Sequence, residues 1–268
     1  MRVNDKVILV TGAGSGIGRE LALLLLSKGA RVAGVDINAE TLEQTSALAC
    51  QRSIDFQPVK VDVTDRVAVE RLPEQVNTGL GPVDAIINNA GIIQPFAKIK
   101  DLDYPTIERV LSVNLLGALY VIKAFLPHLL ARPEAHVVTL SSMGGFVPVP
   151  GQTIYCAAKA GVKLMSEGLA SELIGTNVHV TVVFPGAIAT NISENSGVAA
   201  PPVDSAQAGK MRPMAATKAA EIIIRAMERN AREEFVGRDS AFMNRLYRLN
   251  PGFAARTIAN RMRSLLPA

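Results

Sequence analysis

The chain has 268 residues, 49% of them hydrophobic, and a mean hydropathy of +0.24, values typical of a globular protein with a large core and not of a disordered one. The net charge is +4, but six arginines and one acid lie from Arg238 onward, so residues 1–237 together carry −1. The positive charge therefore belongs to the C-terminal segment, which argues against a nucleic-acid-binding face on the rest of the chain.

Hydrophobic runs and cysteines narrow the class further. The longest apolar stretch, residues 110–122, contains a serine and an asparagine and is shorter than the roughly 20 residues that cross a bilayer. The N-terminus passes directly into a predicted strand, without the segment order of a signal peptide. Cys50 and Cys156 lie far apart, and the three histidines are scattered. We therefore expect no disulfide framework, no metal site and a cytoplasmic protein.

Strand-like and helix-like segments alternate along the chain. Seven short runs rich in Val and Ile are predicted strands: residues 6–10, 31–36, 56–63, 83–88, 136–141, 178–184 and 233–237. Between them, six stretches have helical spacing: residues 17–28, 39–52, 65–78, 104–131, 153–174 and 217–230. This alternation predicts an α/β fold, a doubly wound, seven-stranded, mostly parallel sheet with helices on both faces.

A glycine-rich turn, TGAGSGIG, joins the first predicted strand to the first helix at Thr11–Gly18. Such a turn lets backbone N–H groups approach a pyrophosphate, and the helix N-terminus favours the negative charge. The order Gly12, Gly16, Gly18 departs from the G-x-G-x-x-G fingerprint, because Ile17 stands where its third glycine would fall. The turn therefore predicts a dinucleotide site of a variant type.

Asp36 ends the second predicted strand. A carboxylate there can accept hydrogen bonds from the adenosine ribose and would repel a 2′-phosphate, and Ile37 supplies no compensating charge. Arg19 is expected to point along the first helix, toward the surface or a phosphate. Asp36 could instead cap the next helix, a role that Asn38 could also fill. The cofactor interpretation predicts NAD rather than NADP.

Tyr155 and Lys159, in the segment TIYCAAKAG, lie four residues apart and hence on one helical face. By spacing alone they also fit a packing tyrosine and a solvent-facing lysine. A phenol has a pKa near ~10, and a cation about 4 Å away at an effective dielectric of about 20 could lower that pKa by up to about three units. We therefore expect Lys159 to bring Tyr155 into the range of a general acid–base.

Taken together and in chain order, these motifs resemble the short-chain dehydrogenase/reductase family over residues 5–237. The resemblance implies a Rossmann-type fold and an NAD-dependent oxidoreductase that interconverts a secondary alcohol and a ketone. The further matching segments are Asp62–Val63 at the end of the third predicted strand, NNAG at 88–91, Asn114 in SVNLLG, Ser142 in LSSMGG and PGAIAT at 185–190.

The resemblance also implies catalytic roles for four residues. Ser142 orients the substrate oxygen, and Tyr155 exchanges a proton while hydride passes between the substrate carbon and the nicotinamide. Lys159 lowers the pKa of the tyrosine and binds the nicotinamide ribose. Asn114 holds a water in a proton relay from the lysine, or is a helix-kinking residue with no proton role. Ser141 adjoins Ser142, whose spacing to the tyrosine fits the family better.

Cofactor contacts are implied along most of the chain. Asp62 and Val63 are expected at the adenine, Asn88 near the ribose, and Ile188 and Thr190 at the carboxamide. The full expected set is Gly12, Ser15, Gly16, Ile17, Gly18, Asp36, Asp62, Val63, Asn89, Ala90, Gly91, Tyr155, Lys159, Pro185, Gly186, Ile188 and Thr190.

The substrate is expected to be a small hydrophobic alcohol or ketone. Met143, Phe146, Val147 and Val149 suggest an apolar pocket, and residues 187–216, rich in proline and small residues, are a predicted substrate lid. The alternative function is a catalytically silent NAD-binding sensor or scaffold, which would be expected to lack the tyrosine or the lysine.

The expected organisation is one catalytic domain, residues 1–237, followed by a basic helical extension, residues 238–268. In residues 253–268 an apolar helical face comprises Ala254, Ile258, Met262 and Leu265. That helix either packs on its own domain or a neighbouring subunit, or lies weakly on an anionic membrane. The family further implies a homodimer or homotetramer that uses the helix at 104–131.

Overall fold

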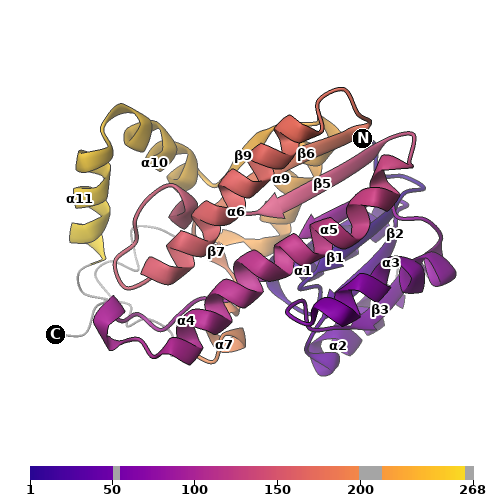
Figure 1. The fold of residues 1–268 in the computed structure, drawn as a ribbon, viewed down its shortest axis with the longest axis horizontal. Coiled ribbons are helices and arrows are strands. Elements are labelled where there is room, and N and C mark those ends of the chain that lie inside the picture. Colours follow the sequence, from indigo (N-terminus) through magenta and orange to yellow (C-terminus); the bar gives the residue numbers. More distant parts are fainter. Residues whose placement is uncertain (51–54, 199–212, 263–268) are drawn as a thin grey trace.

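The computed structural model describes residues 1–50, 55–198 and 213–262, and its centre is one seven-stranded sheet. The strands lie in the order β3-β2-β1-β4-β5-β6-β9, and every neighbouring pair is parallel (Figure 1). Their bounds are β1 Val7–Thr11, β2 Arg31–Asp36, β3 Phe56–Lys60, β4 Ala85–Asn88, β5 Ala135–Leu140, β6 Val178–Pro185 and β9 Glu233–Val236. The predicted doubly wound fold is confirmed, with a sheet that is entirely parallel rather than mostly so.

Helices follow the strands and cover both faces of the sheet (Figure 1). They are α1 Gly16–Ser27, α2 Ala39–Cys50, α3 Arg66–Leu80, α4 Tyr104–Leu111, α5 Gly117–Leu130, α6 Thr153–Glu172, α7 Ile192–Asn195, α9 Ala216–Glu228, α10 Arg238–Leu249 and α11 Pro251–Arg261. Short 3-10 turns lie at Ile99–Asp101 and Met143–Gly145, and a small parallel pair joins β7 Ile188–Ala189 to β8 Met214–Ala215.

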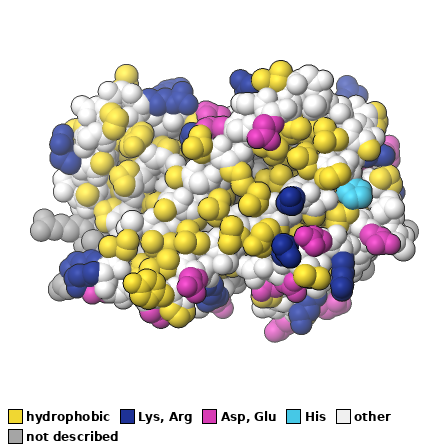
Figure 2. Space-filling view, in the orientation of Figure 1, with side chains coloured by type: hydrophobic (Ala, Val, Ile, Leu, Met, Phe, Trp, Pro, Cys, Tyr) yellow, Lys and Arg dark blue, Asp and Glu magenta, His cyan; other side chains and the backbone are white. Residues whose placement is uncertain are grey.

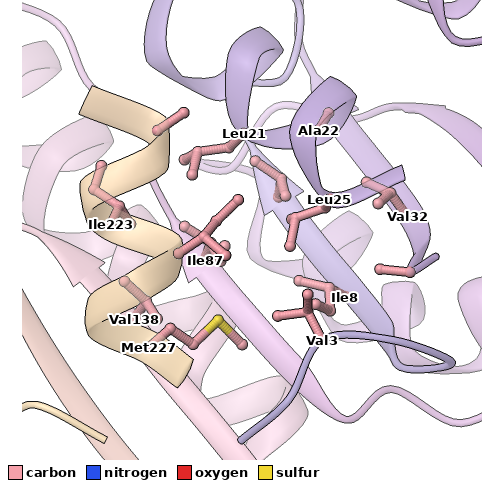
Figure 3. Packing of buried hydrophobic residues seen from close by; sticks show 14 of the residues in the cluster. Val3, Ile8, Leu21, Ala22, Leu25, Val32, Ile87, Val138, Ile223 and Met227 are labelled. Atoms are coloured by element: carbon pink, nitrogen blue, oxygen red, sulfur yellow. The ribbon is translucent and has the colours of Figure 1, made fainter. Parts of the chain in front are cut away.

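Alternating side chains of the strands build two separate cores. In β1, Ile8 faces the cluster formed with α1 and α9, whereas Leu9 faces the cluster formed with α3, α5 and α6. Figure 3 shows the first cluster, in which Ile223 and Met227 of α9 lie against the sheet. Strands buried on both faces must be apolar at almost every position, which explains their near-continuous hydrophobic sequence.

The helix predicted at 104–131 is interrupted. A π-helical turn, Ser112–Leu116, separates α4 from α5, and the Asn114 side chain donates to the Val110 carbonyl within it at 2.9 Å. In the described residues, Tyr104–Leu130 alone has the length and hydropathy of a membrane span. Of its apolar 18-residue window, 33% is buried inside the structure. Its buried residues, such as Phe125, pack on the sheet, as those of a core helix do.

The C-terminal helices form a third, smaller core at one end of the molecule (α10 and α11 in Figure 1). Ala254 and Ile258, from the predicted apolar face of the tail, are buried together with Met243 of α10 and Val147 of the loop after β5. The packing on its own domain, one of the two alternatives, therefore accounts for this face. Residues 263–268 lie outside the described part, and contact with a membrane stays an untested prediction.

Candidate active site

A cavity of about 980 Å³ lies at the carboxyl ends of the strands, where the strand order reverses between β1 and β4. Connections on the two sides of this point leave the sheet in opposite directions, which opens a crevice suited to a dinucleotide. The predicted catalytic and cofactor residues all line this cavity, except Gly18. Asn88 is buried in β4 and also does not reach it, whereas Asn89 does.

The glycine turn needs its glycines for two different reasons. Gly12 and Gly16 have φ values of 69° and 52°, the left-handed region that glycine adopts without strain. Gly18 has no such φ, but any Cβ there would overlap the backbone carbonyl oxygen of Gly12. Gly18 therefore allows close packing of the turn on α1, and it does not line the cavity.

Thr11 fastens the glycine turn to the loop after β4. Its hydroxyl oxygen accepts hydrogen bonds from the backbone N–H groups of Asn89 and Ala90, both at 3.0 Å. In return, the Asn89 side chain donates to the carbonyl of Thr11 at 2.9 Å and to that of Gly12 at 3.3 Å. The two loops that would hold the adenosine and pyrophosphate are thus one hydrogen-bonded unit.

Asp36 lies at the cavity rim, and its carboxylate orders the turns on either side. It accepts hydrogen bonds from the Gly14 N–H at 2.8 Å and from the Asn38 N–H at 2.9 Å. The Asn38 side chain caps α2 by accepting from the N–H groups of Glu40 and Thr41, at 3.0 and 3.2 Å. Asn38 is therefore the cap of α2, and Asp36 remains available at the cavity.

Arg19 differs from the expectation that it points to the surface or to a phosphate. Its guanidinium donates to the Gly14 carbonyl, to the Thr41 carbonyl at 3.2 Å and to the Thr45 hydroxyl at 3.0 Å. These contacts hold the glycine turn against α2, because a planar guanidinium can reach several acceptors at once. Arg19 does not line the cavity.

The loop that follows β3, where the adenine is expected, bounds one part of the cavity. The third strand ends at Lys60, so Asp62 and Val63 lie beyond it rather than within it. One carboxylate oxygen of Asp62 accepts from both the N–H and the hydroxyl of Thr64, each at 2.8 Å. Arg109 of α4 also lines the cavity, a position that the sequence motifs did not single out.

Two adjacent serines at the end of β5 have different partners. Ser141 is 3% exposed, and its hydroxyl donates to the backbone carbonyl of Lys159 at 2.8 Å. The Ser142 hydroxyl lines the cavity and accepts from the Gly144 N–H at 3.1 Å. Ser142 therefore presents its hydroxyl to the cavity and to Tyr155, whereas the hydrogen of Ser141 is occupied by a backbone carbonyl.

Tyr155 and Lys159 lie on the cavity side of α6, with the lysine Nζ 5.9 Å from the centre of the tyrosine ring. Burial raises the pKa of Tyr155 to about 12, partly opposed by a hydrogen bond with Ser142. Burial lowers the pKa of Lys159 to about 8. The predicted fall in the tyrosine pKa is therefore wrong for this structure, because burial disfavours the charged phenolate. The Lys159 Nζ instead donates to the Leu140 carbonyl at 2.9 Å.

Asn114 has little hydrogen-bonding capacity left for a relay. Its amide nitrogen donates to the carbonyls of Ile92 and Val110, both at 2.9 Å, and its oxygen accepts from the Ile92 N–H at 3.3 Å. That oxygen and the Lys159 Nζ both lie next to Gly91. A Cβ added to this glycine would be 2.8 Å from the oxygen and 3.2 Å from the Nζ. A relay water at this point could therefore only donate to the asparagine oxygen.

The described part of the predicted lid folds over the site. The side chain of Asn195 in α7 donates to the Ser15 hydroxyl of the glycine turn at 2.7 Å. The buried hydroxyl of Ser196 accepts from the Ile93 N–H of the loop after β4 at 3.0 Å. Two loops of the site are thus linked to α7, while residues 199–212 of the lid lie outside the described residues.

The apolar wall near Ser142 differs from the expected one. The four residues proposed for the pocket, Met143, Phe146, Val147 and Val149, do not line the cavity but pack against α10 and α11. In the described residues, the apolar lining of the cavity instead includes Ile92, Ile93 and Ile192. The sequence around Ser142 is apolar because it supports the C-terminal helices.

Comparisons with known proteins agree with this geometry. The family model described as short chain dehydrogenase matches residues 6–199. The putative oxidoreductase SadH of Mycobacterium tuberculosis is 39% identical over 196 residues, covering 72% of this chain and 71% of SadH. The uncharacterized oxidoreductase SSP1627 of Staphylococcus saprophyticus is 31% identical over 243 residues, covering 89% and 98%.

Solved structures match over nearly the whole chain. A short-chain dehydrogenase/reductase from Burkholderia phymatum, in complex with NAD, has a TM-score of 0.84 at 24% identity and covers 94% of this chain and 96% of its own. A short-chain dehydrogenase from Burkholderia cenocepacia, in complex with NADP, has a TM-score of 0.80 at 26% identity, covering 96% and 99%. Nicotinamide cofactors thus occur among the neighbours in both forms.

Proposed function

The chain belongs to the short-chain dehydrogenase family, and we propose that it is an NAD-dependent oxidoreductase that interconverts a secondary alcohol and a ketone on a small hydrophobic molecule. The observation that carries this proposal is the arrangement of one cavity. Ser142, Tyr155 and Lys159 meet at one end, and the glycine turn and Asp36 form the other. A bound nicotinamide would supply the hydride chemistry, and the chain would supply position and protons.

The protonation states suit carbonyl reduction at neutral pH. With a pKa of about 12, Tyr155 holds its proton at pH 7 and can donate it to a developing alkoxide. With a pKa of about 8, Lys159 is mostly protonated and carries a positive charge beside the phenol. Ser142 would donate to the same substrate oxygen and so fix its position. In the reverse direction Tyr155 must lose its proton, which favours higher pH.

Asp36 supports NAD over NADP. Its carboxylate stands at the end of β2, where the adenosine ribose binds in this fold, and a 2′-phosphate would meet its negative charge. Ile37 follows it and is 60% exposed, so no positive side chain comes from that position. Arg19 of α1, which follows the glycine turn, is held by its contacts with α2.

A hydrophobic substrate is supported by isoleucines that line the same cavity as Tyr155, namely Ile92, Ile93 and Ile192. The alternative function, a silent NAD-binding sensor, shares the cofactor site but needs no proton donor. We favour the enzyme because Ser142 and Tyr155 both reach the cavity and interact with each other. A cytoplasmic location stays a prediction from the cysteine spacing.

A homo-oligomer is proposed through the face of α4, α5 and α6. Figure 2 shows hydrophobic side chains spread over this face, with few charged ones between them. Leu119 of α5 and Leu164 of α6 are 38% and 69% exposed, although both helices pack on the sheet with their other sides. The change Leu164→Glu should shift the protein toward monomer in light-scattering chromatography, whereas Ser171→Glu on the same helix should not.

The test of the proposed function is a titration of the purified protein with NAD and then NADP. A screen of hydrophobic secondary alcohols would follow, monitored at the absorbance band of the reduced nicotinamide. Tighter binding of NAD together with turnover of an alcohol is the expected result. Binding of NAD without turnover of any alcohol or ketone would favour the sensor, and tighter binding of NADP would contradict the role given to Asp36.

A further inference from the structure

Gln94, in the loop after β4, is fully buried, with 0% of its side chain exposed, and contacts the start of the helix that carries Tyr155. Its side-chain oxygen accepts hydrogen bonds from the N–H groups of Ile154 at 2.9 Å and Tyr155 at 3.1 Å. Its side-chain nitrogen donates to the Gly151 carbonyl at 3.0 Å. All hydrogen-bonding groups of the Gln94 side chain are thus directed at residues 151–155.

These contacts replace the usual cap of a helix. The first N–H groups of a helix have no partner within it, and a side chain just before the helix normally accepts from the second or third of them. In α6 the preceding residue, Gln152, makes no such bond. Gln94 accepts from the second and third N–H groups instead, from about 60 residues earlier in the chain.

Hydrogen bonds run in both directions between the loop after β4 and the start of α6. The Gln152 side chain donates to the Gln94 backbone carbonyl at 2.7 Å, and Gln152 is itself 4% exposed. Neighbours of Gln94 in the same loop reach other walls of the cavity, since Asn89 contacts the glycine turn and Ile93 contacts the lid. The loop therefore sets the distance between the cofactor end and the first turn of α6.

A neutral cap also matters for the chemistry. Helices α3 and α4 are capped by the carboxylates of Asp65 and Asp103. A carboxylate at the start of α6 would place a negative charge close to the phenol and make its proton harder to remove. The amide of Gln94 satisfies the same N–H groups without that charge.

From these observations we propose that Gln94 is the positioning residue of Tyr155: it caps α6 from the cofactor-binding loop and so fixes the phenol in the cavity. This inference rests on the proposed function only in taking Tyr155 as the proton donor. Gln94 acts through the helix and touches neither substrate nor cofactor in this account.

The first test needs no turnover and no variant. Amide hydrogen exchange on the unmodified protein should find the Ile154 and Tyr155 N–H groups as protected as the interior of α6, because Gln94 holds both. Exchange as fast as in a frayed helix end would overturn the proposal. This readout separates it from the proposed function, since it holds whether or not a substrate is found.

The second test compares Gln94→Leu with Gln152→Leu. The Gln152 variant loses the hydrogen bond to the Gln94 carbonyl but keeps the two bonds by which Gln94 caps α6. The phenol is titrated by ultraviolet absorbance, as the difference between each protein and its Tyr155→Phe counterpart. In Gln94→Leu the pKa of Tyr155 should fall from about 12 toward the ordinary value of about 10. The reason is that the first turn of α6, without its cap, admits water to the phenol. In Gln152→Leu the pKa should stay near 12. Equal midpoints in the two variants would contradict the proposal.

Kinetics with the alcohol found in the screen provide the third readout. Gln94→Leu should lower kcat by about 10- to 100-fold, with the affinity for NAD unchanged, since a small displacement of a reacting group costs that much. Gln94→Glu keeps both acceptor contacts and should recover most of kcat. The rate of alcohol oxidation rises with pH as Tyr155 loses its proton. The negative charge added in Gln94→Glu should move this rise to higher pH. No recovery in Gln94→Glu, or a loss of NAD affinity equal to the loss of kcat, would contradict a positioning role.

Discussion

The carboxylate of Asp239 accepts a hydrogen bond from the backbone N–H of Ala187 at 2.8 Å. Asp239 lies in the first turn of α10, beyond the segment matched by the family model, and Ala187 lies in the loop expected to hold the nicotinamide. The next residue, Ser240, donates to the Phe184 carbonyl at the end of β6, also at 2.8 Å. Helix α10 therefore holds in place the side of the cavity that is expected to bind the nicotinamide.

The change Asp239→Ala should loosen this loop. Removing the acceptor leaves the exposed Ala187 N–H to water, so the free energy of unfolding should fall by only about 0.5–1.5 kcal/mol. The affinity for NAD should fall together with kcat, because the loop no longer fixes the nicotinamide ring. Thermal unfolding and NAD titration measure the two effects. Asp103→Ala, which removes the cap of α4 and does not line the cavity, is the control: it should cost stability but leave NAD affinity unchanged.

Asp36→Asn should change the cofactor preference. The amide keeps one acceptor oxygen for the turn but removes the negative charge, so NAD loses a charge-assisted hydrogen bond and the 2′-phosphate of NADP loses a repulsion. The affinity for NAD should fall about 10- to 100-fold, the equivalent of about 1.5–3 kcal/mol. Competition between the two cofactors measures this directly. An unchanged ratio of NAD to NADP affinity would show that Asp36 does not determine the cofactor preference.

Lys159→Met should make the protein more stable at pH 7 while removing activity. The folded protein lowers the pKa of Lys159 to about 8 from 10.5, so at pH 7 it holds a buried charge at a cost in stability. Between these two pH values the unfolded chain binds the additional proton, and the stability of the wild type rises with pH. The stability advantage of the variant should therefore shrink from pH 8 to pH 10.

Denaturant unfolding of both proteins across this range measures the difference. Other groups titrate similarly in the two proteins, so the change in the difference reports Lys159. If the difference in the free energy of unfolding stays constant or widens with pH, the lysine is charged and fully hydrogen-bonded in the folded protein.

Gly18→Ala should abolish NAD binding although Gly18 does not line the cavity. The added Cβ would overlap the Gly12 carbonyl, so the turn must move away from α1. The matched control is Gly168→Ala in α6, where no atom lies within 4 Å of the added Cβ. This control should bind NAD normally and gain about 0.5–1 kcal/mol of stability, because alanine favours a helix over glycine. Normal NAD binding by Gly18→Ala would contradict the packing role.

Features of the site that depend on local chain geometry could be predicted from the sequence. The glycine turn, Asp36 at the end of β2 and the spacing of Tyr155 from Lys159 all lie within one strand, one helix or one tight connection. A parallel sheet then brings such segments together at the carboxyl ends of its strands, because every strand points the same way. The fold and the meeting of these residues followed from that rule.

Other features depend on partners distant in the sequence and could not be predicted. The cap of α6 comes from Gln94, about 60 residues away, and no local pattern marks it. The raised pKa of Tyr155 depends on how much water the surrounding walls exclude. Likewise, Phe146 looked like a pocket residue because it is apolar and follows Ser142, yet it stacks edge-on against Phe184 and Phe235.

Tyr155 is proposed to transfer the proton in an NAD-dependent reaction. The most direct measurement compares the wild type with Tyr155→Phe, which keeps the ring and its packing but lacks the hydroxyl, by following reduced nicotinamide during turnover of an alcohol. We predict that the variant binds NAD with wild-type affinity and loses about 10²- to 10⁴-fold in kcat. Turnover by Tyr155→Phe at the wild-type rate would contradict the account.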